Sequence, residues 1–257
     1  MTPGMTIRDV HHKQNVMNIK TYIPNTITCL NLLCGCIAVF LAFHSGAQHM
    51  GLYGFQWAWI FIGAAAVFDF CDGLSARLLG AYSPMGKELD SLSDLVSFGL
   101  APAFLVLNTM MGSGAPVGVS LTALFIALMG ALRLAKFNVD TRQATSFVGL
   151  PIPANAIFWI GTLGWIDVHG YPGDTVMVIL ILGMSLLMVS ELKMFSLKFH
   201  DMSLRGNVRR YTVLAACVLF VITDGVAGLA WTIVLYILIS LLGKRTDPDN
   251  MEGNTQA

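Results

Sequence analysis

Long apolar stretches recur along the whole chain, and each approaches or exceeds the roughly 20 residues that a helix needs to cross a bilayer. Of the 257 residues, 55% are hydrophobic and 12% are charged, which is about half the charged share of an average soluble domain. Backbone polar groups find no partners in lipid, so spanning stretches form helices. The sequence therefore predicts an all-α integral membrane protein, a bundle of about eight transmembrane helices at 26–46, 56–79, 90–111, 116–137, 151–168, 173–194, 209–223 and 226–243.

The basic residues give an independent check on this topology. All fifteen lysines and arginines fall near the same end of the predicted spans, whereas the opposite connections, such as 112–116 and 169–173, contain none. The positive-inside rule then places both termini in the cytoplasm, and we expect the cytoplasmic membrane of a prokaryote. The formal net charge is zero, so the chain has no overall basic field that would indicate nucleic acid as a partner.

Four aspartates stand inside or beside the second and third spans. Asp69 and Asp72 are three residues apart and Asp90 and Asp94 four apart, so each pair projects from one face of its helix. An acid at mid-bilayer costs about 2.5–3.5 kcal/mol, so such residues normally face a polar cavity. If the two helices pack as an antiparallel hairpin, the pairs converge into an all-oxygen ligand set. That set favours Mg²⁺, Mn²⁺ or Ca²⁺, and two such ions could clamp the oxygens of a phosphoryl displacement.

The residues around these aspartates suit a diphosphate. Gly73 and Ala76 leave the helix surface bare, so a bulky anion can approach the backbone. Arg77 supplies a planar donor fork for phosphate oxygens, and Gly86 is expected to permit an unusual backbone conformation where the chain turns into the third span.

The pattern D-x2-D-G-x2-A-R-x8-G-x3-D-x3-D, which runs from Asp69 to Asp94, resembles the signature of the CDP-alcohol phosphotransferases in every fixed position and spacing. The resemblance implies a six-helix core in which Asp69, Asp72 and Asp90 hold the metals. Asp94 would complete the metal site and act as general base on the acceptor hydroxyl. The residues expected to contact the CDP group are Gly73, Ala76, Arg77 and Gly86.

Three further segments, at 22–31, 133–139 and 147–153, are similar to those of bacterial phosphatidylserine synthases of the multi-span type. This implies a homodimer that transfers a phosphatidyl group from CDP-diacylglycerol to L-serine. Asn25 and Thr28 would contact the nucleotide, and Arg133 and Lys136 the serine carboxylate. The expected organisation is a polar segment (1–21), the catalytic membrane core (22–195), an additional helix pair (196–245) and a polar tail (246–257).

Other interpretations stay open at this point. The same chemistry could serve glycerol 3-phosphate or an inositol phosphate, and intramembrane acids also occur in ion-coupled transporters. Asn25, Thr28 and Asn31 could merely cap and join helices. Arg133 and Lys136 could simply anchor a helix end at the cytoplasmic face.

Overall fold

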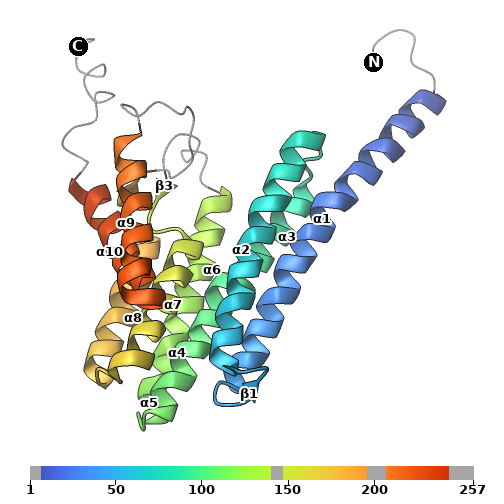
Figure 1. The fold of residues 1–257 in the computed structure, drawn as a ribbon. Coiled ribbons are helices and arrows are strands. Elements are labelled where there is room, and N and C mark those ends of the chain that lie inside the picture. Colours follow the sequence, from blue (N-terminus) through green and yellow to red (C-terminus); the bar gives the residue numbers. More distant parts are fainter. Residues whose placement is uncertain (1–6, 140–146, 196–206, 243–257) are drawn as a thin grey trace, which may run out of the picture. The chain divides into compact units, whose positions relative to one another are not determined.

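A computed structural model of the chain describes residues 7–139, 147–195 and 207–242, with side chains from Lys20 onward (Figure 1). Within these ranges the protein is almost entirely helical, and its strands are two residues long. The all-α class is therefore confirmed. Some features of the sequence lie outside the described residues, namely the polar tail at 246–257 and Arg142, Lys198, Arg205, Lys244 and Arg245.

The chain divides into two compact units, Met1–Asn108 and Thr109–Ala257. The elements of the first unit are α1 (Ile7–Phe43), β1 (Gln48–His49), β2 (Leu52–Tyr53), α2 (Gly54–Leu79), α3 (Pro84–Asp94), the π-helical segment η1 (Leu95–Leu100) and α4 (Ala101–Gly112), which ends in the second unit. Helix α1 begins at Ile7, so it already includes most of the polar segment expected to precede the first span.

Five helical segments of the described chain are long and apolar enough to cross a membrane. They are Lys20–Phe43, Gly54–Leu79, Pro84–Gly112, Val117–Val139 and Val208–Leu242, and helix α8 (Asp174–Val189) is also apolar but shorter. On α2, one face exposes the large apolar side chains of Ile60, Val67, Phe70 and Leu78. A helix of a soluble protein would bury such side chains in the protein core. Their exposure on α2 is typical of a helix face that contacts lipid.

The first unit is organised around α1, which packs along α2 and also against α3 and η1. Its interior contains many small residues, which let helix backbones approach closely. At Gly35 a Cβ atom would lie only 2.8 Å from the Cα atom of Ser97 in η1. Helices α2 and α3 make few direct backbone contacts with each other. The expected hairpin of the second and third spans is therefore held together through α1.

Helix α3 begins six residues before the start predicted for the third span. Pro84 occupies the first turn, where a missing N–H costs nothing, and the Ser83 hydroxyl accepts a hydrogen bond from the Gly86 N–H at 2.9 Å. These are ordinary helix-start signals, but the first turns are too polar to register in hydropathy. Asp90 consequently lies inside α3, and Asp94 is its last residue, after which η1 continues the helical chain.

The second unit contains α5 (Val117–Ser120), η2 (Leu121–Ala123), α6 (Leu124–Val139), β3 (Phe147–Val148), α7 (Ile152–His169), α8 (Asp174–Val189), β4 (Lys193–Met194), α9 (Val208–Asp224), η4 (Gly225–Ala227) and α10 (Gly228–Leu242). Helix α7 packs closely on α10, where a Cβ atom at Gly161 would lie 2.2 Å from the Ala230 nitrogen. Helix α6 packs against α8, and β3 pairs antiparallel with β4.

Candidate active site

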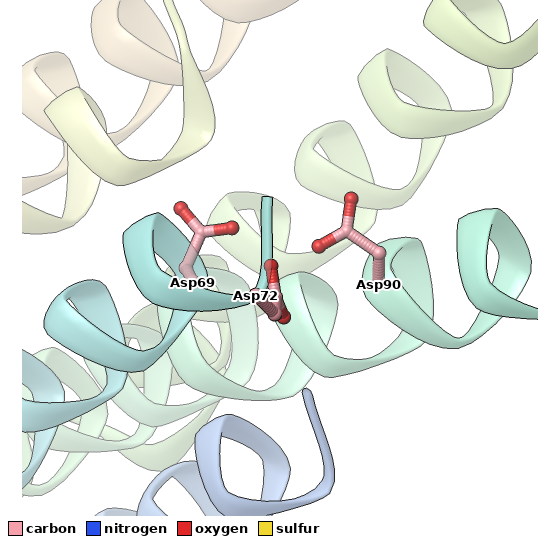
Figure 2. Close-up of side chains that lie close together, drawn as sticks. All are labelled: Asp69, Asp72 and Asp90. Atoms are coloured by element: carbon pink, nitrogen blue, oxygen red, sulfur yellow. The ribbon is translucent and has the colours of Figure 1, made fainter. Parts of the chain in front are cut away.

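Three of the four predicted aspartates form a tight cluster in the first unit. Asp69 and Asp72 come from α2 and Asp90 comes from α3 (Figure 2). Each offers one carboxylate oxygen such that these atoms all lie within 4.8 Å of one another. On α2 the aspartates share a helix face with buried Ala65, opposite the face that exposes Ile60 and Val67. The spacing argument thus correctly brings these side chains together.

The cluster fits a bound cation. Asp69 and Asp90 lie within hydrogen-bond reach of each other, and two carboxylates at this separation repel unless a proton or cation lies between them. Among the described residues, the Oδ2 atom of Asp72 and the Oδ1 atom of Asp90 are buried and accept no hydrogen bond. A buried carboxylate oxygen without a partner is costly. An oxygen-seeking divalent ion would satisfy both atoms.

Asp94 stands one helical turn beyond Asp90 and outside the group of three. It lies within electrostatic range of Asp69, Asp90 and Asp72, and its Oδ1 atom accepts a hydrogen bond from the Asn31 amide at 3.4 Å. The π-helical segment η1 begins at the next residue, with the Ala101 N–H donating to the Val96 carbonyl five residues back. Single π-helical turns often occur at functional sites.

A cavity of about 200 Å³ adjoins the cluster, and Asp72 and Asp90 form part of its wall. Five of the predicted nucleotide contacts also line it, namely Asn25, Thr28, Gly73, Ala76 and Gly86. The Thr28 side chain is within hydrogen-bond reach of Asp72. Residues that are separate in sequence on α1, α2 and α3 therefore face one space.

Arg77 does not line this cavity. Its Nε atom donates to the Gly73 carbonyl at 2.9 Å, one turn back on α2, and its side chain is exposed. The structure therefore holds the guanidinium along the helix and outside the cavity wall.

The backbone role expected for Gly86 is wrong. Positive φ occurs instead at Gly80, which ends α2 with φ of 59°, a conformation that glycine adopts readily. Gly86 lies in the first turn of α3, where a Cβ atom would be 3.0 Å from both the Asn25 Oδ1 atom and the Ser83 Oγ atom. Its missing side chain provides space in the cavity wall.

Sequence reasoning did not identify several other residues that line the cavity. They are Pro24, Ala81, Tyr82, Ser83 and Lys87. Four of them belong to the turn and first helical residues that join the two aspartate-bearing helices. Their place in the sequence was the signal that could have identified them, because a short connection between the two helices that carry the aspartates lies close to the site.

Arg133 and Lys136 belong to the second unit, on α6. Arg133 is buried, and its guanidinium carbon lies 5.7 Å from the centre of the Phe137 ring. Lys136 forms an ion pair with Glu191 and also approaches the Val189 carbonyl at the end of α8. The structure thus gives Lys136 a contact that joins α6 to α8.

These observations define a helical membrane protein with a carboxylate cluster and a cavity formed by its first three long helices. The chain belongs to the CDP-alcohol phosphatidyltransferase family, whose model matches residues 21–195.

Individual relatives carry a more specific name. The chain is 35% identical over 180 residues to a CDP-diacylglycerol–serine O-phosphatidyltransferase of Bacillus subtilis, covering 70% of this chain and 93% of the relative. An enzyme of the same name from Methanocaldococcus jannaschii is 36% identical over 171 residues, covering 66% and 72%. That of Mycobacterium leprae is 31% identical over 236 residues, covering 86% and 72%.

Proposed function

We propose that this protein transfers the phosphatidyl group of CDP-diacylglycerol to the hydroxyl of L-serine, giving phosphatidylserine and CMP. The observation that carries the proposal is the cluster of Asp69, Asp72 and Asp90 beside the cavity, in a chain whose relatives bear the name of this activity. Serine is favoured over glycerol 3-phosphate or an inositol phosphate as the acceptor, because relatives from several organisms are named as serine O-phosphatidyltransferases.

In this proposal Asp69, Asp72 and Asp90, together with Asp94, hold divalent cations, with Mg²⁺, Mn²⁺ and Ca²⁺ as candidates and two as the expected number. Such ions would neutralise negative charge on phosphate oxygens during displacement. The aspartates would set the position of that charge, because they come from α2 and α3, which both pack against α1.

The cavity would receive the nucleotide end of the donor. Its volume of about 200 Å³ is below the roughly 300–1,000 Å³ of clefts that enclose a whole ligand, so it suits part of the CDP group. Asn25 and Thr28 offer polar side chains from α1, while Gly73, Ala76 and Gly86 leave backbone accessible. Arg77 donates its Nε proton to the Gly73 carbonyl, and its other guanidinium N–H groups would be available to a phosphate of the donor.

Asp94 is the proposed general base. The serine hydroxyl gives its proton to the Asp94 carboxylate while its oxygen forms a bond to the lipid-side phosphorus. The bond from that phosphorus to the CMP oxygen breaks, and its electron pair leaves with CMP. Base catalysis of this kind contributes about 10²–10⁴-fold to a rate.

The substitution Asp94→Asn tests the base role directly. Purified Asp94→Asn protein should bind CDP-diacylglycerol with near-normal affinity but release CMP at least about 100-fold more slowly than the original protein. Turnover like that of the unmodified protein would disprove the assignment. The assay offers serine, glycerol 3-phosphate and inositol phosphate in separate reactions. If CMP is released only with one of the phosphate-bearing alcohols, that alcohol and not serine is the acceptor.

Removal of divalent ions is a second test. Treatment with a chelator should abolish CMP release, and titration with Mg²⁺, Mn²⁺ or Ca²⁺ should restore it with the ion that the site prefers. Because the assay runs in detergent without a gradient, ion-dependent CMP release also separates an enzyme from an ion-coupled transporter.

Arg133 is the proposed partner of the serine carboxylate, with Lys136 as the second candidate. Arg133→Ala should raise the KM for serine and leave the KM for CDP-diacylglycerol unchanged. Lys136→Ala should act mainly on stability, because Lys136 already pairs with Glu191. An unchanged serine KM in Arg133→Ala would remove Arg133 from the proposal.

The remaining assignments concern the whole chain. We propose residues 22–195 as the catalytic core, close to the range of the family match, with the helix pair 196–245 as an addition. The distribution of lysine and arginine supports a site that faces the cytoplasm in the inner membrane of a prokaryote. Resemblance to the family supports a homodimer, which light scattering of the purified protein would test.

A further inference from the structure

Asn31 is a fully buried polar residue in an otherwise apolar part of α1, with none of its surface exposed. Its Nδ2 atom donates to the Asp94 Oδ1 atom at 3.4 Å, across 63 residues of sequence. A buried amide without partners is costly, so the contact with Asp94 stabilises the amide in this position. Among the described residues, this hydrogen bond links a side chain of α1 to the proposed base.

The backbone around Asn31 is held in place by serines of the facing helix. The Ser97 hydroxyl donates to the Asn31 carbonyl at 3.0 Å, and the Ser93 hydroxyl donates to the Thr28 carbonyl at 3.2 Å. One turn further along α1, Gly35 allows Ser97 to come close. These contacts fix the register of α1 against α3 and η1, so the Asn31 amide is presented to Asp94 from a rigid backbone.

A purely structural asparagine would be expected to have both ends of its amide satisfied, because buried side-chain polar atoms are nearly always paired. Within the described chain the Oδ1 atom of Asn31 is buried and has no hydrogen-bond partner. The Nδ2 end of the amide thus contacts Asp94, while the Oδ1 end has no partner in this part of the structure. Both amide ends of buried Asn155 also have no partner there, so it is the direct contact with the Asp94 carboxylate that favours a role in the site over a role as a simple link between helices.

We propose that Asn31 is a positioning residue for Asp94. Its amide donates to one carboxylate oxygen, which fixes the plane of the carboxylate and leaves the second oxygen to accept the proton of the acceptor hydroxyl. The inference rests on the function proposed above, in which Asp94 is the base. Asn31 itself neither gains nor loses a proton, and the bonds made and broken are those of the transfer already described.

The test uses full-length purified protein with Asn31→Leu, which keeps a similar volume and removes the amide, and Asn31→Gln, which keeps an amide. Asn31→Leu should lower kcat about 10- to 100-fold while the KM values for serine and CDP-diacylglycerol change less than about twofold. Asn31→Gln should recover part of the lost kcat. Thr232→Val is the matched control, since it removes a buried hydroxyl bonded within α10 and should leave kcat unchanged.

A double-substitution cycle separates positioning from general stability. In the Asp94→Asn background, Asn31→Leu should cause no further loss of the residual rate, because the carboxylate that it orients is gone. Equal losses in both backgrounds, or a raised KM with normal kcat, would overturn the inference. The melting temperature and the affinity for CDP-diacylglycerol are measured for every variant, so a folding defect is recognised as such and counts against the inference.

The two proposals fail in different ways. If Asp94→Asn turns over normally, the base assignment is wrong and the inference falls with it. If Asp94→Asn is inactive but Asn31→Leu has normal kcat, the proposed function stands and only the role of Asn31 is refuted.

Discussion

Gly86 shows at the scale of one residue how the cavity wall is shaped by a missing side chain. A Cβ atom there would lie 3.0 Å from the Asn25 Oδ1 atom and from the Ser83 Oγ atom. That separation is shorter than normal contact, so one of the two side chains has to move. The Ser83 hydroxyl caps α3, and Asn25 lines the proposed nucleotide cavity.

A prediction about Gly86 follows from this crowding. Gly86→Ala should raise the KM for CDP-diacylglycerol about tenfold, equivalent to about 1.4 kcal/mol, with a smaller change in kcat, because the displaced Asn25 occupies nucleotide space. Steady-state kinetics of CMP release measure both quantities. Gly63→Ala is the matched control, since no atom lies within 4 Å of a Cβ atom at Gly63 on α2. Equal kinetics for the two variants would contradict the prediction.

Individual residues differ in how far the sequence could reveal their roles. The convergence of Asp69, Asp72 and Asp90 was predictable, because helical spacing and the cost of an acid in a membrane both limit where such residues can point. Asn31 was not, because an asparagine in an apolar helix equally suits helix association. Its contact with Asp94 depends on a partner 63 residues away, which local pattern cannot supply.

At the scale of elements, α1 decides the geometry of the site. It contacts α2, α3 and η1, and serine hydroxyls of α3 and η1 donate to its Thr28 and Asn31 carbonyls. The sequence predicted each long helix but not this bridging arrangement, because hydropathy shows which segments cross the membrane and says little about their neighbours. The π-helical turn at Leu95–Leu100 was also unforeseen, since no proline or charge marks it.

A prediction at this scale concerns the closest approach of α1 to η1. In Gly35→Ala the new Cβ atom would lie 2.4 Å from the Ser97 Oγ atom and 2.8 Å from the Ser97 Cα atom. Side-chain rotation cannot relieve a clash with backbone, so the helices have to separate. Overpacking of this kind costs about 1–3 kcal/mol. The melting temperature should fall, and kcat should fall with it because Asn31 lies one turn away.

Thermal unfolding in detergent and CMP release measure the two effects of Gly35→Ala. Gly183→Ala on α8 provides the control, because no atom lies within 4 Å of a Cβ atom there. A Gly35→Ala protein as stable and active as the Gly183→Ala protein would show that α1 and η1 are not tightly packed.

At the scale of the whole molecule, the amino-acid composition alone predicted that the protein lies in a lipid bilayer. The outward faces of long helices carry large apolar side chains, as a bilayer requires. The division into two compact units at Asn108 was not predictable, since it falls inside α4 and no change in composition marks it. A division of this kind arises from which helices contact each other, which the apolar pattern leaves undetermined.

The last prediction concerns which side of the membrane the site faces. Met85, at the start of α3, is exposed and lies between Arg77 and Lys87, whereas exposed Ser113 follows α4 in a connection without lysine or arginine. The positive-inside rule places residue 85 in the cytoplasm. Pro84–Gly112 is long enough to span the membrane, so residue 113 should lie on the opposite side.

Single cysteines test this sidedness in a protein whose five natural cysteines are replaced and whose CMP release is intact. A membrane-impermeant maleimide, which reacts with thiolates in water, should label Met85→Cys only in inside-out vesicles and Ser113→Cys only in intact cells. The reverse pattern would place the carboxylate cluster on the outer side, away from cytoplasmic serine. Labelling of both positions from one side would mean that Pro84–Gly112 does not cross the bilayer.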